Sequence, residues 1–154
     1  MINKLIIIVL LGILGALIGS ILGKKLKEKT LYYCDLVDFC EKVIADVRLD
    51  RYGIDKVIEG FSSKSEPLKK DINGYKAKKV FEPSAIAGKN RELLVSFFES
   101  ISSFDEYRQI EVLKSKKEEI KKIADSLVTR LKKEYSAYVK LGFLFGISVG
   151  VLMI

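Results

Sequence analysis

The stretch that decides the fold is "LIIIVLLGILGALIGSILG" at residues 5–23, nineteen residues without a charged side chain. An α-helix rises about 1.5 Å per residue, so this run would extend roughly 29 Å, close to the hydrocarbon thickness of a bilayer. A second uncharged run, "LGFLFGISVGVLMI" at residues 141–154, would extend roughly 21 Å as a helix. We predict one transmembrane helix within residues 1–23 and another at residues 141–154.

Each apolar run has a competing interpretation. The first could be a cleaved signal peptide with Lys4 as its basic region, but signal peptides usually have apolar cores of about 7–15 residues. The sequence "KKLK" at residues 24–27 also follows at once, as a stop-transfer signal does. The second run could be the buried tail of a soluble domain, but it is apolar on every helical face. Just before it, Lys140 can reach the headgroups, and Tyr135 and Tyr138 lie where interfacial aromatic residues belong.

The distribution of charge predicts the orientation in the membrane. Residues 24–140 hold all 20 acidic residues and all but one of the 27 basic residues. Lysine and arginine next to membrane spans favour the cytoplasmic side. Such residues flank both runs on the side of the middle segment: Lys24, Lys25, Lys27, Lys29, Arg130, Lys132, Lys133 and Lys140. We therefore predict a two-span protein of the cell membrane whose domain at residues 24–140 is cytoplasmic.

The middle segment has the pattern of an all-α domain. Apolar residues recur at spacings of three and four, and no alternating strand pattern competes with them. Thr30 is a candidate N-cap, Ser103 and Glu106 can form a capping box, and residues 82–90 are expected to be a loop. We predict a cytoplasmic bundle of about five to six helices, joined to an N-terminal and a C-terminal transmembrane helix. The soluble helices are expected at residues 30–49, 54–61, 67–81, 91–101 and 103–139, the last continuing into the membrane.

Residues that could support catalysis or metal binding do not form a recognisable motif. The chain has no histidine, and Cys34 and Cys40 form no Cys-x-x-Cys pair, so we expect reduced thiols and no zinc site. The fragment "GKN" at residues 88–90 lacks the rest of a phosphate-binding loop. Acidic residues alternate with lysine and arginine, as they do on solvated helix faces. We predict that the protein is not an enzyme and has no cofactor and no metal.

The basic character of the chain leaves other binding functions open. The formal net charge of +7 and the isoelectric point of about 9.3 would suit nucleic acid or an anionic membrane surface. In "KSKKEEIKK" at residues 114–122, however, glutamates interrupt the lysines, and this pattern disfavours nucleic acid. The alternative function is a membrane-tethered basic helical protein that binds nucleic acid or an anionic lipid surface. A holin-like pore protein would have little use for so large a middle segment.

Small residues repeat at every fourth position in both apolar runs. Such repeats form a flat groove that allows helix backbones to approach closely in lipid, where packing drives association. Glycine is also simply common in membrane helices, which is the alternative explanation. A parallel row of Gly12, Ala16 and Ser20 accompanies the repeat in the first run. We predict that the main repeat packs against other membrane helices through Gly15, Gly19, Gly23, Gly142, Gly146 and Gly150.

Three segments resemble one known family, stage III sporulation protein AB of endospore-forming Firmicutes. The segment "YVKLGFLFGISVGVLMI" at residues 138–154 is similar to the short apolar helix that closes that family after a basic residue. The segment "FESISSFDEYRQIEVL" at residues 98–113 is similar to its helix end followed by an aspartate and a glutamine, here Asp105 and Gln109. Ser102 stands where the family has glycine. "RLDRYGIDKVIEGF" at residues 48–61 resembles its Tyr-Gly pair before a short amphipathic helix.

The resemblance implies a role, partners and a location. The family is an all-helical cytoplasmic bundle with a membrane hairpin, related to the F-type platform proteins of type II secretion. Its members belong to the mother-cell membrane part of the channel complex that links mother cell and forespore. The resemblance therefore implies a non-enzymatic scaffold or platform needed for sporulation, with its bulk domain in the mother-cell cytoplasm. Other channel membrane proteins and a secretion-type ATPase are the implied partners, and self-association is a further expectation.

The turn that carries Asp105 and Gln109 has two interpretations. Aspartate and serine at a helix start accept hydrogen bonds from free backbone N–H groups, which is typically worth about 1 kcal/mol. Gln109 lies one turn into the helix and could tie down the preceding loop. We expect this structural role, whereas the family resemblance would make the turn a contact point for the ATPase or another channel component.

Overall fold

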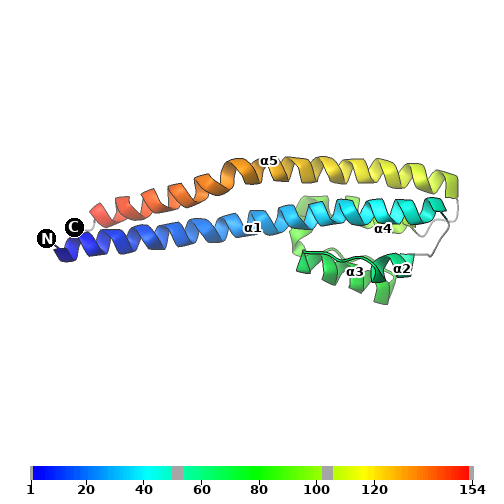
Figure 1. Cartoon of the computed structure of the whole chain (residues 1–154), viewed down its shortest axis with the longest axis horizontal. Coiled ribbons are helices and arrows are strands. Elements are labelled where there is room, and N and C mark those ends of the chain that lie inside the picture. Colours follow the sequence, from blue (N-terminus) through cyan, green and yellow to red (C-terminus); the bar gives the residue numbers. More distant parts are fainter. Residues whose placement is uncertain (1, 50–53, 102–105, 153–154) are drawn as a thin grey trace. The chain divides into compact units, whose positions relative to one another are not determined.

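The computed structural model describes residues 2–49, 54–101 and 106–152, whose course is shown in Figure 1. Within these ranges the chain is all-α, as predicted, and contains no strand. The elements are α1 (Ile2–Leu49), α2 (Ile54–Glu59), α3 (Glu66–Lys78), the 3-10 helix η1 (Ala85–Asn90), α4 (Arg91–Ile101) and α5 (Glu106–Leu152). The expected fold class is therefore confirmed, with the two apolar runs at the outer ends of the longest helices.

The chain packs as two compact units, which we describe separately. The hairpin unit comprises Met1–Glu28 and Ser126–Ile154, and the bundle unit comprises Lys29–Asp125. These boundaries follow packing within the protein, whereas the predicted divisions after residues 23 and 140 refer to the edges of a bilayer. The domains 1–23, 24–140 and 141–154 therefore stay a prediction.

The helix α1 is 48 residues long, although the sequence predicted a helix start at Thr30. That prediction is wrong, because Thr30 lies inside the helix and is buried there. No glycine or proline occurs between Gly23 and Leu49, and lysine, leucine and glutamate, all strong helix formers, follow Gly23. The chain therefore has no local reason to interrupt the helix before Leu49.

The helix α3 begins and ends at recognisable signals. Ser65 is its N-cap, with a side chain that accepts a hydrogen bond from the backbone N–H of Leu68 at 3.4 Å. Pro67 lies in the first turn, as predicted, where its missing N–H costs nothing. The helix stops at Lys78 rather than near residue 81, because Lys79 adopts a left-handed conformation with φ 56°.

Residues 82–90 are more regular than the predicted loop. They contain η1, in which Gly88 has φ 57° and ψ −129°, a conformation that favours glycine. The carbonyl of Ala87 accepts a hydrogen bond from the Tyr33 hydroxyl of α1 at 2.9 Å. This bond fixes the segment to the bundle unit and explains why it is ordered without a long helix.

An aromatic cluster forms the centre of the bundle unit. The Phe98 ring of α4 stacks on Phe81, with ring centroids 3.7 Å apart, and on Phe39 of α1 at 5.6 Å. Tyr75 of α3 meets the same ring edge-on at 4.9 Å. The apolar residues of α4 that recur at spacings of three and four face this core, and α5 contributes buried apolar residues as well. The buried residues of these two helices include Leu94, Phe97, Phe98, Leu113, Ile120 and Ala124.

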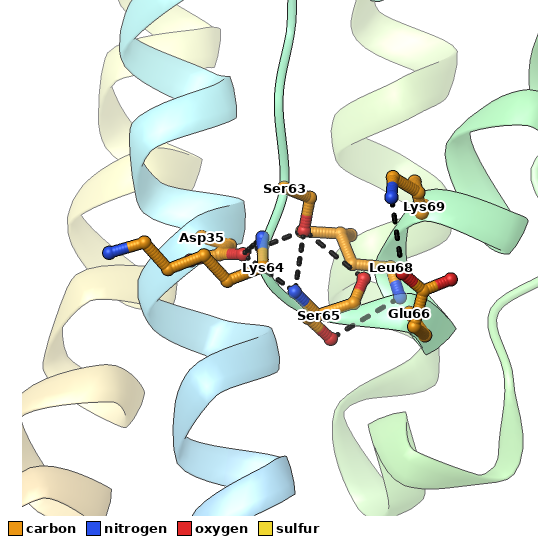
Figure 2. A network of polar contacts seen from close by, with 7 residues as sticks. All are labelled: Asp35, Ser63, Lys64, Ser65, Glu66, Leu68 and Lys69. Carbon is orange, nitrogen blue, oxygen red and sulfur yellow. Dashed lines mark hydrogen bonds and ion pairs between the residues drawn. The ribbon is translucent and has the colours of Figure 1, made fainter.

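A buried carboxylate on α1 fixes the loop that leads into α3. Oδ2 of Asp35 accepts a hydrogen bond from the Ser63 hydroxyl at 2.7 Å. The backbone N–H groups of Lys64 and Ser65 donate to the same oxygen at 2.6 and 2.9 Å (Figure 2). Asp35 is only 8% exposed, and a buried charge is tolerated where such hydrogen bonds replace water. Because Ser65 also caps α3, the anchor on α1 and the start of α3 are joined.

A second buried carboxylate, Asp71 of α3, joins α1 to the segment after α3. The Tyr32 hydroxyl donates to its Oδ2 at 2.8 Å, and the backbone N–H of Ser84 donates to the same oxygen at 2.9 Å. Burial, together with the charge of Asp71, raises the pKa of the Tyr32 phenol well above its ordinary value. The phenol therefore stays protonated as a donor to Asp71 in the folded protein.

Candidate functional site

The glycines predicted for helix packing meet inside the hairpin unit, where α1 and α5 are antiparallel. A Cβ atom added to Gly15 would overlap the carbonyl oxygen of Gly142 and lie 3.1 Å from the Cα of Gly146. A Cβ atom on Gly142 would in turn overlap the carbonyl oxygen of Gly15 and lie 3.3 Å from the backbone nitrogen of Gly19. The two backbones are therefore in direct contact, which no residue with a side chain would permit at these positions.

Two tyrosines of α5 extend this contact along α1. A Cβ atom on Gly19 would overlap the carbonyl oxygen of Tyr138 and lie 3.2 Å from the Cα of Val139. A Cβ atom on Gly23 would lie 2.6 Å from the Tyr135 ring, so this ring lies against the glycine. The repeat in α1 thus accommodates α5 backbone at Gly19 and an aromatic side chain at Gly23.

The contact continues in the opposite direction at the remaining glycines. A Cβ atom on Gly146 would overlap the carbonyl oxygen of Leu11, and one on Gly150 would lie 3.0 Å from the Cα of Ile8. All six glycines of the predicted repeat therefore lie in one contact, which we call the glycine contact. The sequence indicated the packing faces but not their partner, and here the partner of each apolar run is the other run of the same chain.

The other faces of the hairpin unit expose large apolar side chains. They include Ile6, Ile7, Val9, Leu10, Ile13, Leu14, Leu17, Ile18 and Ile21 of α1, and Leu141, Phe143, Leu144, Phe145, Val151 and Leu152 of α5. Both helices are long and apolar enough to cross a membrane. Only 24% of the most apolar window of α1 and 11% of that of α5 is buried within the protein, whereas the core helix of a soluble protein is mostly buried.

Polar groups of α5 adjoin the tyrosine end of the glycine contact. Arg130 donates two hydrogen bonds, each 3.0 Å long, to the two carboxylate oxygens of Glu134. The Tyr138 hydroxyl donates to Glu134 at 2.9 Å. Hydrogen bonding to Arg130 lowers the pKa of Glu134 below its ordinary value, so this pair is charged at neutral pH. The Tyr138 hydroxyl is thus joined to the charged pair one turn earlier in the same helix.

Gln109 holds the end of α4, and Asp105 lies outside the described residues. The side-chain amide of Gln109 donates to the carbonyl of Ile101 at 2.7 Å and to that of Ser100 at 3.2 Å. The last carbonyls of a helix have no partner within it, so Gln109 supplies two of the missing hydrogen bonds. This geometry agrees with the structural interpretation of the turn. A role of Asp105 and Gln109 in binding a partner stays a prediction.

Sequence reasoning missed the polar side chains that join distant elements of the bundle unit, namely Asp35, Asp71 and Lys116. The ammonium group of Lys116 on α5 donates to the carbonyl of Ser96 on α4 at 2.6 Å. One signal could have identified Asp35. It lies three residues after Tyr32 and one before Leu36, on the apolar face of its helix, where an acidic residue requires hydrogen-bond donors.

The titratable groups that could take part in chemistry are poor candidates in this environment. Among the described residues, no group of three or more His, Cys, Asp or Glu side chains could hold a metal ion. Burial raises the pKa of the Cys40 thiol far above its ordinary value. Burial and then the charges of Asp35 and Asp38 raise that of Cys34. Because the thiolate is the nucleophile, neither cysteine is activated at neutral pH.

Comparison of the chain with protein-family models, with curated proteins and with solved structures finds no match in any of the three. The glycine contact and the exposed apolar faces around it are therefore the main guides to function. The glycine contact joins the two apolar helices, and the large apolar side chains on the outer faces of these helices take no part in it.

Proposed function

We propose that the protein is a membrane scaffold, anchored by two spans, that holds its bundle unit at the membrane. The observation that carries this proposal is the glycine contact between two helices whose outer faces are large, apolar and exposed. Apolar surface in water costs about 25 cal/mol per Å², so faces of this kind favour a surrounding of lipid. Close backbone packing at small residues is the means by which helices associate in lipid.

The proposed topology places the bundle unit on the cytoplasmic side. It is supported by the basic residues next to both apolar runs, such as Lys24, Lys25, Lys132 and Lys133. Anionic headgroups of the inner leaflet would attract the same lysines. The protein is then a two-span protein of the cell membrane, with both apolar helices entering from the cytoplasm.

We further propose that this scaffold is a platform component of the channel between mother cell and forespore and is needed for sporulation. The resemblance of residues 48–61, 98–113 and 138–154 to stage III sporulation protein AB supports this role. Its partners would be the other membrane proteins of that channel and a secretion-type ATPase in the mother-cell cytoplasm. The protein would act by binding and positioning these partners rather than by catalysis.

Topology is tested by cysteine labelling in intact cells. Lys70 is exposed on α3, so a Lys70→Cys variant should resist a membrane-impermeant maleimide until the membrane is permeabilised. A cysteine added after residue 154 should react without permeabilisation. Labelling is preferable to a reporter inserted at residues 62–66, because Ser63 and Ser65 are bonded to Asp35 and an insertion would break this anchor. Equal reactivity of the two cysteines in intact cells would contradict the two-span topology.

The sporulation role is tested by deleting the gene in its own host. We expect the mutant to fail to complete sporulation, and the tagged protein to co-purify with channel membrane proteins from detergent extracts of sporulating cells. Normal spore yield in the deletion strain would contradict the role. A salt-sensitive gel shift of nucleic acid by the purified protein would instead support the alternative of a tethered nucleic-acid binder.

A further inference from the structure

The bundle unit has an open groove between α1 and α5 that none of the features above explains. Its volume is about 690 Å³, and it follows one face of α1 over about two turns and one face of α5 over about one turn. The apolar part of its floor is Ile44, which is 8% exposed, and Ala45, which is exposed. We call this feature the α1–α5 groove. A floor of small and medium apolar side chains between two helices fits a third helix.

In one part of the α1–α5 groove, a single lysine is paired with two glutamates, so these three groups have a formal charge of −1. The ammonium group of Lys117 lies 3.4 Å from Oε1 of Glu41 and 3.1 Å from Oε1 of Glu118. Lys117 is only 17% exposed, and these contacts, with Glu118 first, raise its pKa above the ordinary value. Lys117 lies on α5 between the buried residues Leu113 and Ile120, and the two glutamates explain how a lysine is tolerated there.

The other part of the groove carries two basic residues. Arg48 lies seven residues beyond Glu41 on α1, and Lys114 lies three residues before Lys117 on α5. Since the two helices are antiparallel, as Figure 1 shows, both steps lead in the same direction along the groove. Neither Arg48 nor Lys114 has an ion-pair partner among the residues that the structure describes. The groove therefore has a cationic end next to an apolar floor.

We propose that the α1–α5 groove binds an amphipathic α-helix of another protein, with small apolar residues over Ile44 and Ala45 and acidic residues facing Arg48 and Lys114. This inference deepens the proposed scaffold function and rests on it for the existence of a partner. Helices recognised in grooves supply apolar anchors at i, i+3 or i+4 and i+7, and two turns of groove accept such a set. Complementary charge at one end fixes the direction of the bound helix.

A second copy of this chain is a poorer occupant. Packed in parallel, it would bring Arg48 and Lys114 against the same two cations and would be repelled. Packed antiparallel, it would offer Glu41 and Glu118 to these cations, but Lys117 already engages both carboxylates. A separate acidic helix has neither disadvantage.

The test measures binding of synthetic peptides to the full chain in lipid nanodiscs by fluorescence anisotropy. One fluorescein-labelled peptide of fourteen residues carries a helical stripe of leucine and alanine flanked by glutamate, and its counterpart has lysine in place of glutamate. We expect the acidic peptide to bind at least about tenfold more tightly than the basic one. The double variant Arg48→Glu with Lys114→Glu should reverse this preference. Equal binding of the two peptides to the unchanged protein would overturn the proposal.

Matched variants separate this site from general charge effects. Lys64→Glu with Lys70→Glu changes the net charge equally at exposed positions outside the groove and should keep the preference for the acidic peptide. Ala45→Trp fills the groove without a change of charge and should weaken binding by a similar factor. If the Lys64→Glu, Lys70→Glu variant lost the preference for the acidic peptide as fully as the Arg48→Glu, Lys114→Glu variant, the attraction would be nonspecific and the proposal would be overturned. A labelled fourteen-nucleotide DNA strand serves as a further probe. The proposal would also be overturned if this strand bound tightly through Arg48 and Lys114 while the acidic peptide did not bind.

The assay uses purified protein and is independent of sporulation. Normal sporulation in the deletion strain would therefore contradict the channel role and leave the peptide result standing. A failure of peptide binding would remove the groove as a docking site and leave the membrane scaffold in place.

Discussion

In the hairpin unit, Gly15 and Gly142 bring two helix backbones into contact, whereas in the bundle unit the stacked rings of Phe98 and Phe81 fill the space between elements. The hairpin unit exposes many of its large apolar side chains, and the bundle unit buries most of its own. The bundle unit also uses hydrogen bonds to the buried carboxylate of Asp35 to fix a loop. Helices are thus joined in two different ways within one chain.

The difference follows from the solvent that each unit suits. In water, burial of bulky apolar side chains is the main driving force, so large aromatic residues belong between helices. In lipid, the tails are as apolar as leucine and this force vanishes, so helices gain most from close contact at small residues. A comparison of equivalent substitutions in the two units therefore tests whether each is adapted to its own solvent.

The largest effect is expected when the glycine contact is filled. Leucine at Gly142, Gly146 and Gly150 would occupy the space of the α1 backbone, so the two apolar helices must separate. Spin labels introduced as unnatural amino acids at Ile13 and Phe145, which are both exposed, report this separation by pulsed electron paramagnetic resonance in nanodiscs. We expect a narrow distance distribution in the unchanged protein and a longer, broad one in the triple variant.

The control for this experiment changes residues of the same helix outside the glycine row. Val149→Leu with Val151→Leu places leucine on the same apolar helix but leaves all three glycines intact, and the two positions are not part of the glycine contact. This variant should retain the narrow distribution. A triple glycine variant with the same distribution as the control would show that the repeat is ordinary membrane composition.

The substitution Asp35→Ala is expected to lower the free energy of unfolding by about 3 kcal/mol, because buried hydrogen-bond donors would lose a charged acceptor. The Ser63 hydroxyl and the N–H groups of Lys64 and Ser65 would all lose this bond. Chemical denaturation followed by tyrosine fluorescence measures the change. Asp38→Ala on the same helix is the control and should change stability by less than about 0.5 kcal/mol, because Asp38 is exposed. Equal losses in the two variants would contradict the anchor role of Asp35.

A smaller effect is expected at alkaline pH in the bundle unit. Burial raises the pKa of Tyr32 above 10.0, with the charge of Asp71 as the next cause, and burial also raises that of Tyr33. The unfolded chain loses these protons near pH 10, but the folded chain keeps them. The protonated tyrosines therefore contribute their full share to the free energy of unfolding below about pH 10. Above this pH their contribution declines by up to about 1.4 kcal/mol per pH unit for each tyrosine.

The variant Tyr32→Phe isolates one of these two tyrosines. It removes the titrating proton, so the loss of stability per pH unit between pH 10 and pH 11 should be clearly smaller than in the unchanged protein. Denaturation midpoints measured across this range give the slope. The same slope in both proteins would show that Tyr32 does not contribute to the alkaline loss.

The smallest effect, and a gain, is expected at a glycine of the bundle unit. A Cβ atom on Gly74 of α3 would meet no atom within 4 Å, so Gly74→Ala should stabilise the helix by about 0.5–1 kcal/mol. Thermal unfolding of the full chain measures this gain. Gly88→Ala is the contrasting variant and should destabilise, because Gly88 has φ 57°. A loss of stability in Gly74→Ala would contradict the distinction between glycines that pack helices and those that do not.

The parts of the fold that local signals specify could be predicted from the sequence. The helices at the two uncharged runs, the start of α3 at Pro67 and the bounds of α4 depend on neighbours in the chain. Each of these elements lies close to its expected place. The exceptions are local too. Thr30 resembles a cap, but the helix formers on both sides of it are stronger, and Lys79 ends α3 without glycine.

The parts that depend on distant residues could not be predicted. Asp35 and Ser63 are 28 positions apart, and Tyr32 and Asp71 are 39 positions apart. No local sequence pattern indicates which distant residue each of them contacts. The same limitation applied to the glycine repeats. Their spacing showed two flat helix faces, but the alignment of Gly15 with Gly142 depends on the antiparallel packing of two runs at opposite ends of the chain.

The glycine contact also has a consequence for the order of events during biosynthesis. Gly15 and Gly142 are about 130 residues apart, and a ribosome that adds about 5–20 residues per second needs roughly 6–25 s to make the second after the first. In the proposed topology the first span is therefore in the bilayer, with its glycine face towards lipid, while the bundle unit is still being synthesised. During this interval any other membrane helix with small residues along one face can compete for the same surface. Folding of the bundle unit, which keeps α5 close to α1, then raises the local concentration of the correct partner and gives it the advantage over such competitors.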